Sequence, residues 1–62
     1  MANISLTAVL DDQSDVNRGA GGYWLYRSEQ TVNGSPVMDG LYLQRSELPE
    51  RPPRQFQMVI EW

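Results

Sequence analysis

The stretch that decides the fold is residues 23–45, which read YWLYRSEQTVNGSPVMDGLYLQR. It begins and ends with aromatic and aliphatic residues that favour strands, and its centre is the dipeptide Asn33-Gly34. Asn-Gly suits a type I′ turn, because both central residues of that turn require positive φ. We therefore expect a β-hairpin centred on this dipeptide.

The turn also sets the register of the two flanking strands, because each residue then has one partner directly opposite. On one face the expected pairs are Trp24 with Leu43, Tyr26 with Leu41 and Ser28 with Asp39. On the other face they are Tyr23 with Gln44, Leu25 with Tyr42 and Arg27 with Gly40. A shift of one residue would exchange the two faces.

Two further segments alternate apolar and polar residues with a period of two, which is typical of strands with one buried face. They are Asn3–Asp11, with Ile4, Leu6, Ala8 and Leu10 on one face, and Gln55–Trp62, with Phe56, Met58, Ile60 and Trp62 on one face. No stretch has a helical period, and residues 46–54 hold three prolines and allow at most one helical turn. The sequence predicts one all-β domain, residues 1–62. Its expected form is an antiparallel four-stranded meander, either curled into a half-barrel or completed by dimerisation.

Composition excludes several kinds of site. The chain has 62 residues, five Arg, eight Asp or Glu, no His and no Cys, and a net charge of −3. Disulfides, Cys or His metal sites, Cys nucleophiles and His bases are therefore impossible. A core of this size supplies only ~3–5 kcal/mol, which makes oligomerisation a common reinforcement. Because no apolar run approaches a membrane span and no signal peptide is apparent, we expect a cytoplasmic protein with no membrane partner.

Two loops resemble binding motifs only superficially. The segment Asp11–Gly22 has oxygen-bearing residues at alternate positions, but Val16 stands where a calcium loop needs glycine and Gly22 where it needs glutamate. Residues 19–22, Gly-Ala-Gly-Gly, precede a strand rather than the helix that a phosphate loop requires. We expect no metal, no cofactor and no catalytic residue, so the protein is predicted not to be an enzyme.

Apolar side chains lie on both faces of the central hairpin, although a single sheet buries only one. Curling of the sheet, cover by the Pro-rich segment, or a partner would each protect the second face. The expected interaction surface consists of Tyr23, Leu25, Arg27, Met38, Tyr42 and Arg45. Trp62, which follows an apolar strand, is expected to pack in the core or at a subunit contact.

The C-terminal half resembles a pattern found in small uncharacterised bacterial strand-rich proteins. The residues that carry the resemblance are Gly40–Leu48 (GLYLQRSEL), the pair Pro52-Pro53, and Met58–Glu61 (MVIE). The resemblance implies a fold rich in β-hairpins and no particular site residue or activity. Use of arginine alone for positive charge is consistent with a bacterial or phage gene.

We expect a non-enzymatic protein-binding or assembly module in which aromatic residues on the second face anchor a homodimer or another protein. An alternative is single-stranded nucleic-acid binding through tyrosine and arginine stacking, which the net charge of −3 disfavours. A further alternative is a small phage inhibitor of a host enzyme whose acidic loop, Asp11–Asp15, imitates phosphate charge.

Overall fold

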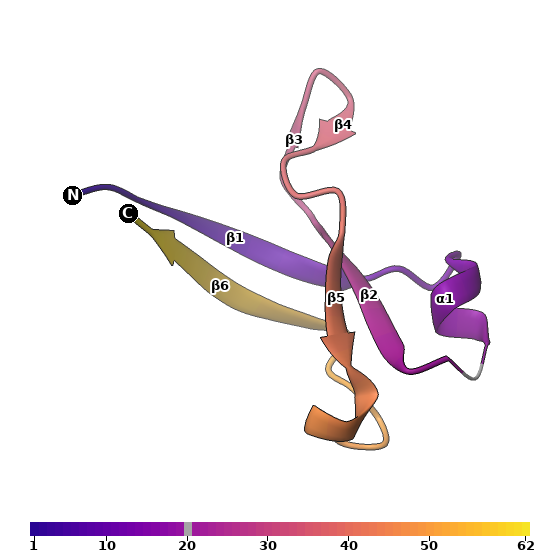
Figure 1. Cartoon of the computed structure of the whole chain (residues 1–62). Helices are drawn as coiled ribbons and strands as arrows, with labels where there is room; N and C mark the ends of the chain where they lie inside the picture. Colours follow the sequence, from indigo (N-terminus) through magenta and orange to yellow (C-terminus); the bar gives the residue numbers. More distant parts are fainter. Residues whose placement is uncertain (20) are drawn as a thin grey trace.

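The computed structural model describes residues 1–19 and 21–62, so Ala20 of the glycine-rich loop lies outside the described residues. Along the chain the elements are β1 (Asn3–Leu10), α1 (Asp15–Arg18), β2 (Tyr23–Ser28), β3 (Thr31–Val32), β4 (Ser35–Pro36), β5 (Leu41–Gln44), the 3-10 turn η1 (Arg45–Glu47) and β6 (Gln55–Glu61). Four strands form one antiparallel sheet in the order β5-β2-β1-β6, and β3 and β4 form a separate small hairpin (Figure 1). The predicted all-β fold, a curled half-barrel sheet, is confirmed.

The central turn forms as its sequence predicts. Asn33 and Gly34 have φ angles of 53° and 82°, so both residues lie in the left-handed region that a type I′ turn requires. The register that follows from this turn is confirmed for all four pairs of β2 with β5, from Tyr23–Gln44 to Tyr26–Leu41.

The expected pairs Ser28–Asp39 and Arg27–Gly40 do not form, because the ladder is interrupted there. The buried Ser28 hydroxyl accepts the Met38 N–H at 2.9 Å and donates to the Gln30 carbonyl at 2.8 Å. This side chain therefore replaces a ladder contact, and the chain leaves the sheet at this point. Asp39 does not lie on the Trp24 face; its exposed carboxylate is 3.8 Å from Arg27 Nε.

The strand order differs from the predicted meander in the last strand. β5, β2 and β1 follow meander order, but β6 lies beside β1, with an unbroken register from Asn3–Glu61 to Val9–Gln55. The Pro-rich segment, residues 48–54, carries the chain from β5 across to the far side of β1. The order is that of a Greek key, in which a fourth strand returns beside the first.

The core is small and lies mostly on one face of the sheet, around Tyr26. This side chain is completely buried, donates its hydroxyl to the Pro53 carbonyl at 2.7 Å, and packs edge-to-face on Phe56 with ring centroids 4.9 Å apart. Leu6 and Ala8 of β1 are buried on the same face. The Pro-rich segment thus closes over the first face of the sheet and does not cover the second.

An asparagine side chain continues the ladder where β1 ends. Asn17 of α1 accepts the Leu25 N–H at 2.7 Å and donates to the carbonyls of Leu25 and Asp11 at 2.8 and 2.7 Å. Its amide presents one donor and one acceptor to β2, as a strand residue would. Asn17 therefore attaches the polar connection between β1 and β2 to the sheet.

Two pairs of strands project from this core, as Figure 1 shows. One is the β3–β4 hairpin, and the other is formed by the ends of β1 and β6 that carry the two termini. Trp62 lies on the second projection and is 70% exposed, so the expectation that it packs in the core is wrong. Ile4 and Ile60, paired on the same projection, are also exposed.

Burial raises the pKa of the Tyr26 hydroxyl above its ordinary value of 10.0. The neutral hydroxyl therefore stabilises the fold fully below about pH 10, and this contribution is lost as pH rises through the folded-state pKa. The double variant Tyr23→Phe, Tyr42→Phe leaves Tyr26 as the sole tyrosine. We expect its phenolate absorbance to appear only above pH 10 and together with loss of the fold. The same variant in urea should titrate near 10; a folded-state pKa at or below that value would contradict this assignment.

Candidate functional site

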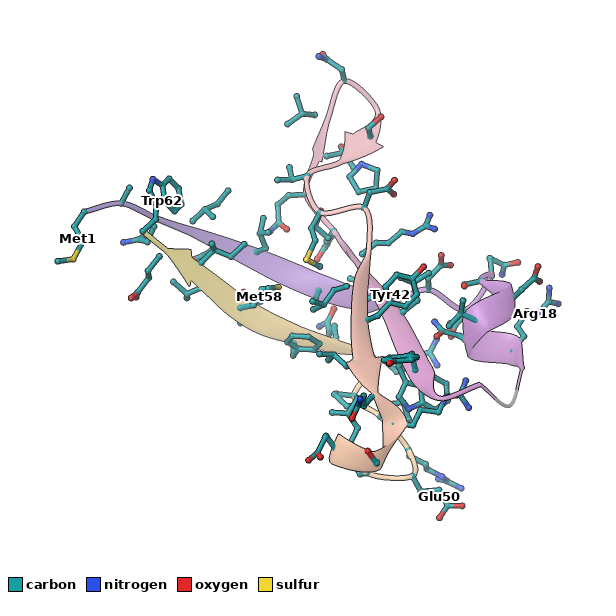
Figure 2. All side chains as sticks on the ribbon, viewed as in Figure 1. Met1, Arg18, Tyr42, Glu50, Met58 and Trp62 are labelled. Atoms are coloured by element: carbon teal, nitrogen blue, oxygen red, sulfur yellow. The ribbon has the colours of Figure 1, made fainter. Side chains whose placement is uncertain are left out.

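The second face of the sheet presents a pair of tyrosines. Tyr23 of β2 and Tyr42 of β5 are diagonal neighbours in the ladder, and their rings meet edge-to-face with centroids 6.3 Å apart. The two residues are 46% and 57% exposed, and Figure 2 shows Tyr42 projecting from β5. Strand pairing fixes both backbones, and the edge-to-face contact places each ring against the other.

Leu25, which was expected on the interaction surface, is buried, at 4% exposure. It lies opposite Tyr42, and its side chain extends over the Gly40 backbone. A Cβ at Gly40 would lie 3.6 Å from Leu25 and 3.8 Å from the Tyr42 ring, which are ordinary van der Waals separations, so both side chains lie near this backbone. Leu25 therefore lies buried on the same face as Tyr42 and is not free to contact a partner.

Arg27 lies on the same face between carboxylates. Its Nε is 3.3 Å from Asp11 Oδ2 and 3.8 Å from Asp39 Oδ1. Beside it is an open hollow of about 360 Å³, whose lining includes Asp11, Asp12 and Glu29. Arg54 pairs with Asp12. With Asp39, four carboxylates and two guanidinium groups thus lie in the region around the hollow, which is net acidic.

Arg45, also expected on the surface, interacts mainly within the chain. Its Nη2 donates to the carbonyls of Val16 and Gly19 at 2.8 and 3.0 Å, and its Nε donates to the Tyr23 carbonyl at 3.0 Å. The guanidinium also stacks on the Trp24 ring, 3.8 Å from the centroid. This side chain attaches α1 and the glycine-rich loop to the start of β2.

The structure brings together only part of the predicted surface. Tyr23, Tyr42 and Arg27 share the second face, whereas Met38 lies half-buried in the irregular stretch between β4 and β5. Sequence reasoning did not place Asp11 and Glu29 beside this surface. Odd-numbered residues of β1 and β2 lie on the second face. Continuing this alternation by one residue past the end of each strand would have placed Asp11 and Glu29 on that face.

No three His, Cys, Asp or Glu side chains within residues 1–19 and 21–62 are grouped as metal ligands. The helical segments described in the structure are all too short and polar to cross a membrane. No protein-family model, curated protein or solved structure matches the chain. Inference about function therefore starts from the geometry of the chain itself.

Replacing Arg45 by lysine should destabilise the fold by about 1–3 kcal/mol, because a lysine keeps the charge but lacks the planar fork that bonds three carbonyls. The matched control is Arg51→Lys at an exposed position of the Pro-rich segment, which should have little effect. Urea unfolding measures both. Equal unfolding midpoints for the two variants would show that Arg45 is a surface arginine after all.

Proposed function

We propose that the protein is a non-enzymatic protein-binding module and that Tyr23 and Tyr42 anchor its partner. The observation that supports this most strongly is the tyrosine pair itself, two half-exposed rings held at right angles by paired strands. Tyrosine supplies a large contact area at low cost in conformational entropy, and rings that are already ordered lose little on binding. Aromatic residues of this kind are frequent hot spots in interfaces.

The charge around the hollow next to Arg27 indicates the kind of partner. Asp11, Asp12, Glu29 and Asp39 exceed the positive charge of Arg27 and Arg54 around the hollow. Complementary potentials favour correct encounter and disfavour other partners. The partner we propose is a protein that offers an apolar pocket for the tyrosines and basic side chains at its rim.

Single-stranded nucleic acid is a less suitable ligand for the same rings. A stacking platform needs arginines that reach phosphate, and most of the affinity comes from those contacts. Arg27 already faces Asp11 and Asp39, and Arg45 is bonded to backbone carbonyls. A phosphate backbone on this face would meet surplus carboxylates. Inhibition of an enzyme remains compatible with the proposal, as one form of protein binding.

Substitution of Tyr23 and Tyr42 by alanine should abolish partner capture. A partner retained by the wild-type chain should bind each single variant at least about tenfold more weakly in calorimetry, as expected for aromatic anchors. The control is Val32→Ala, at a residue of the β3–β4 hairpin that is 61% exposed. Unfolding midpoints of the tyrosine variants show whether the fold is retained.

Two results would contradict the proposal. One is a partner whose affinity is unchanged in the double variant Tyr23→Ala, Tyr42→Ala. The other is a labelled single-stranded oligonucleotide that binds the wild-type chain, loses affinity steeply with salt, and no longer binds the double variant; that result would assign the rings to nucleic acid.

A further inference from the structure

The outer edge of β6 is a second feature of the sheet that a partner can use. Ala2 and Trp62 exchange both backbone bonds, at 2.7 and 3.0 Å, and the Leu10 N–H donates to the Arg54 carbonyl at 2.8 Å. Alternation along an antiparallel pair then directs the backbone groups of even-numbered β6 residues toward β1. The N–H and C=O groups of Gln57, Val59 and Glu61 point the other way, and β6 is the last strand of the sheet.

This edge lacks the features by which proteins usually prevent strand addition. Edge strands are commonly short, bulged, or interrupted by proline or lysine. β6 runs for seven residues, Gln55–Glu61, without a proline, lysine or arginine, and its register with β1 is continuous. Glu61, at its end, is the only charged residue in the strand. The strand is therefore available for pairing along its whole length.

The chain also exposes more surface than a compact protein of its mass. Its accessible area is 4684 Å², whereas a compact monomer of 7.1 kDa exposes about 4,100 Å². Its radius of gyration is 12.3 Å, against about 10.6 Å for 62 residues in a compact domain. The excess of about 600 Å² is close to the roughly 800 Å² that each partner buries in an interface of standard size.

We propose that β6 pairs with β6 of a second copy of the chain in antiparallel fashion, with Val59 opposite the second copy's Val59. In this register Gln57 lies opposite the second copy's Glu61, and the outward-pointing backbone groups of both strands are bonded across the two-fold axis. The two sheets then join into one.

The sequence of β6 is self-complementary in this register, which is why a second copy suits the edge. On the first face, Met58 lies opposite Ile60 and Phe56 opposite Trp62, so every apolar residue meets an apolar residue. Trp62, 70% exposed in the single chain, gains an aromatic neighbour. The acidic Glu61 meets a neutral glutamine, so no like charges face each other across the strands.

This dimer is distinct from the binding proposed for the tyrosines. Tyr23 and Tyr42 lie on β2 and β5, and β5 is at the opposite edge of the sheet from β6. Pairing at β6 leaves them accessible, so each proposal can fail without the other.

The test is the molar mass in solution, measured by sedimentation from about 1 μM to about 1 mM, a range that covers moderate to weak association. The wild-type chain should reach twice 7.1 kDa. Val59→Lys places two like charges opposite each other and should weaken the dimer at least about tenfold. Val59 is 57% exposed, so the monomer should tolerate the change. Val32→Lys, the same substitution at a residue of similar exposure, should leave the dimer intact.

A second measurement needs no variant. Amide exchange at Val59 should slow as the concentration of the wild-type chain rises, because its N–H is bonded only in the dimer. Four results would each overturn the proposal. The chain could be monomeric at all concentrations, or the two lysine variants could weaken the dimer equally. The dimer could also be lost in Tyr42→Ala but not in Val59→Lys, or the Val59 amide could exchange freely in the dimer.

Discussion

The hydrogen bond from the Tyr26 hydroxyl to the Pro53 carbonyl is the contact on which the arrangement of the sheet depends. Tyr26 is completely buried at the centre of β2, and its ring packs on Phe56 at the start of β6. A buried hydroxyl without a partner would be costly, so the Pro-rich segment must lie where its carbonyl can accept this bond. That position brings the chain across the first face and starts β6 beside β1 rather than beside β5.

The core is too small to bury the apolar residues of all the strands. Within residues 1–19 and 21–62 the buried apolar residues are Leu6, Ala8, Leu25 and Tyr26, and they lie on the neighbouring strands β1 and β2. The ends of β1 and β6 and the β3–β4 hairpin extend beyond them (Figure 1). Contiguous exposed apolar patches are typical of surfaces that bind other molecules. The tyrosine pair and the β6 edge are two such surfaces, on different parts of the sheet.

The sequence predicts the strands and the central register well, because period-two alternation and an Asn-Gly turn are both local signals. It does not predict that β6 lies beside β1, since alternation says which face is buried but not which strand is the neighbour. It also misses the positions of Asn17, Ser28 and Arg45, whose side chains bond backbone groups. Arg45 bonds the Val16 carbonyl, 29 residues away in the chain, and Asn17 bonds Leu25, eight residues away. Of the predicted surface, Tyr23 and Tyr42 are exposed together, whereas Leu25 is buried and lies close to the Gly40 backbone.

The most direct test of this account is a measurement of the proton–proton contacts of the Tyr26 ring by nuclear Overhauser spectroscopy, in dilute solution where the chain is monomeric. The account predicts contacts from the Tyr26 ring to the Phe56 ring, at a centroid distance of 4.9 Å, and to residues around Pro53. A Tyr26 ring that contacts only its neighbours in β1, β2 and β5 would show that the Pro-rich segment does not close over the first face. The position of β6 would then need another cause.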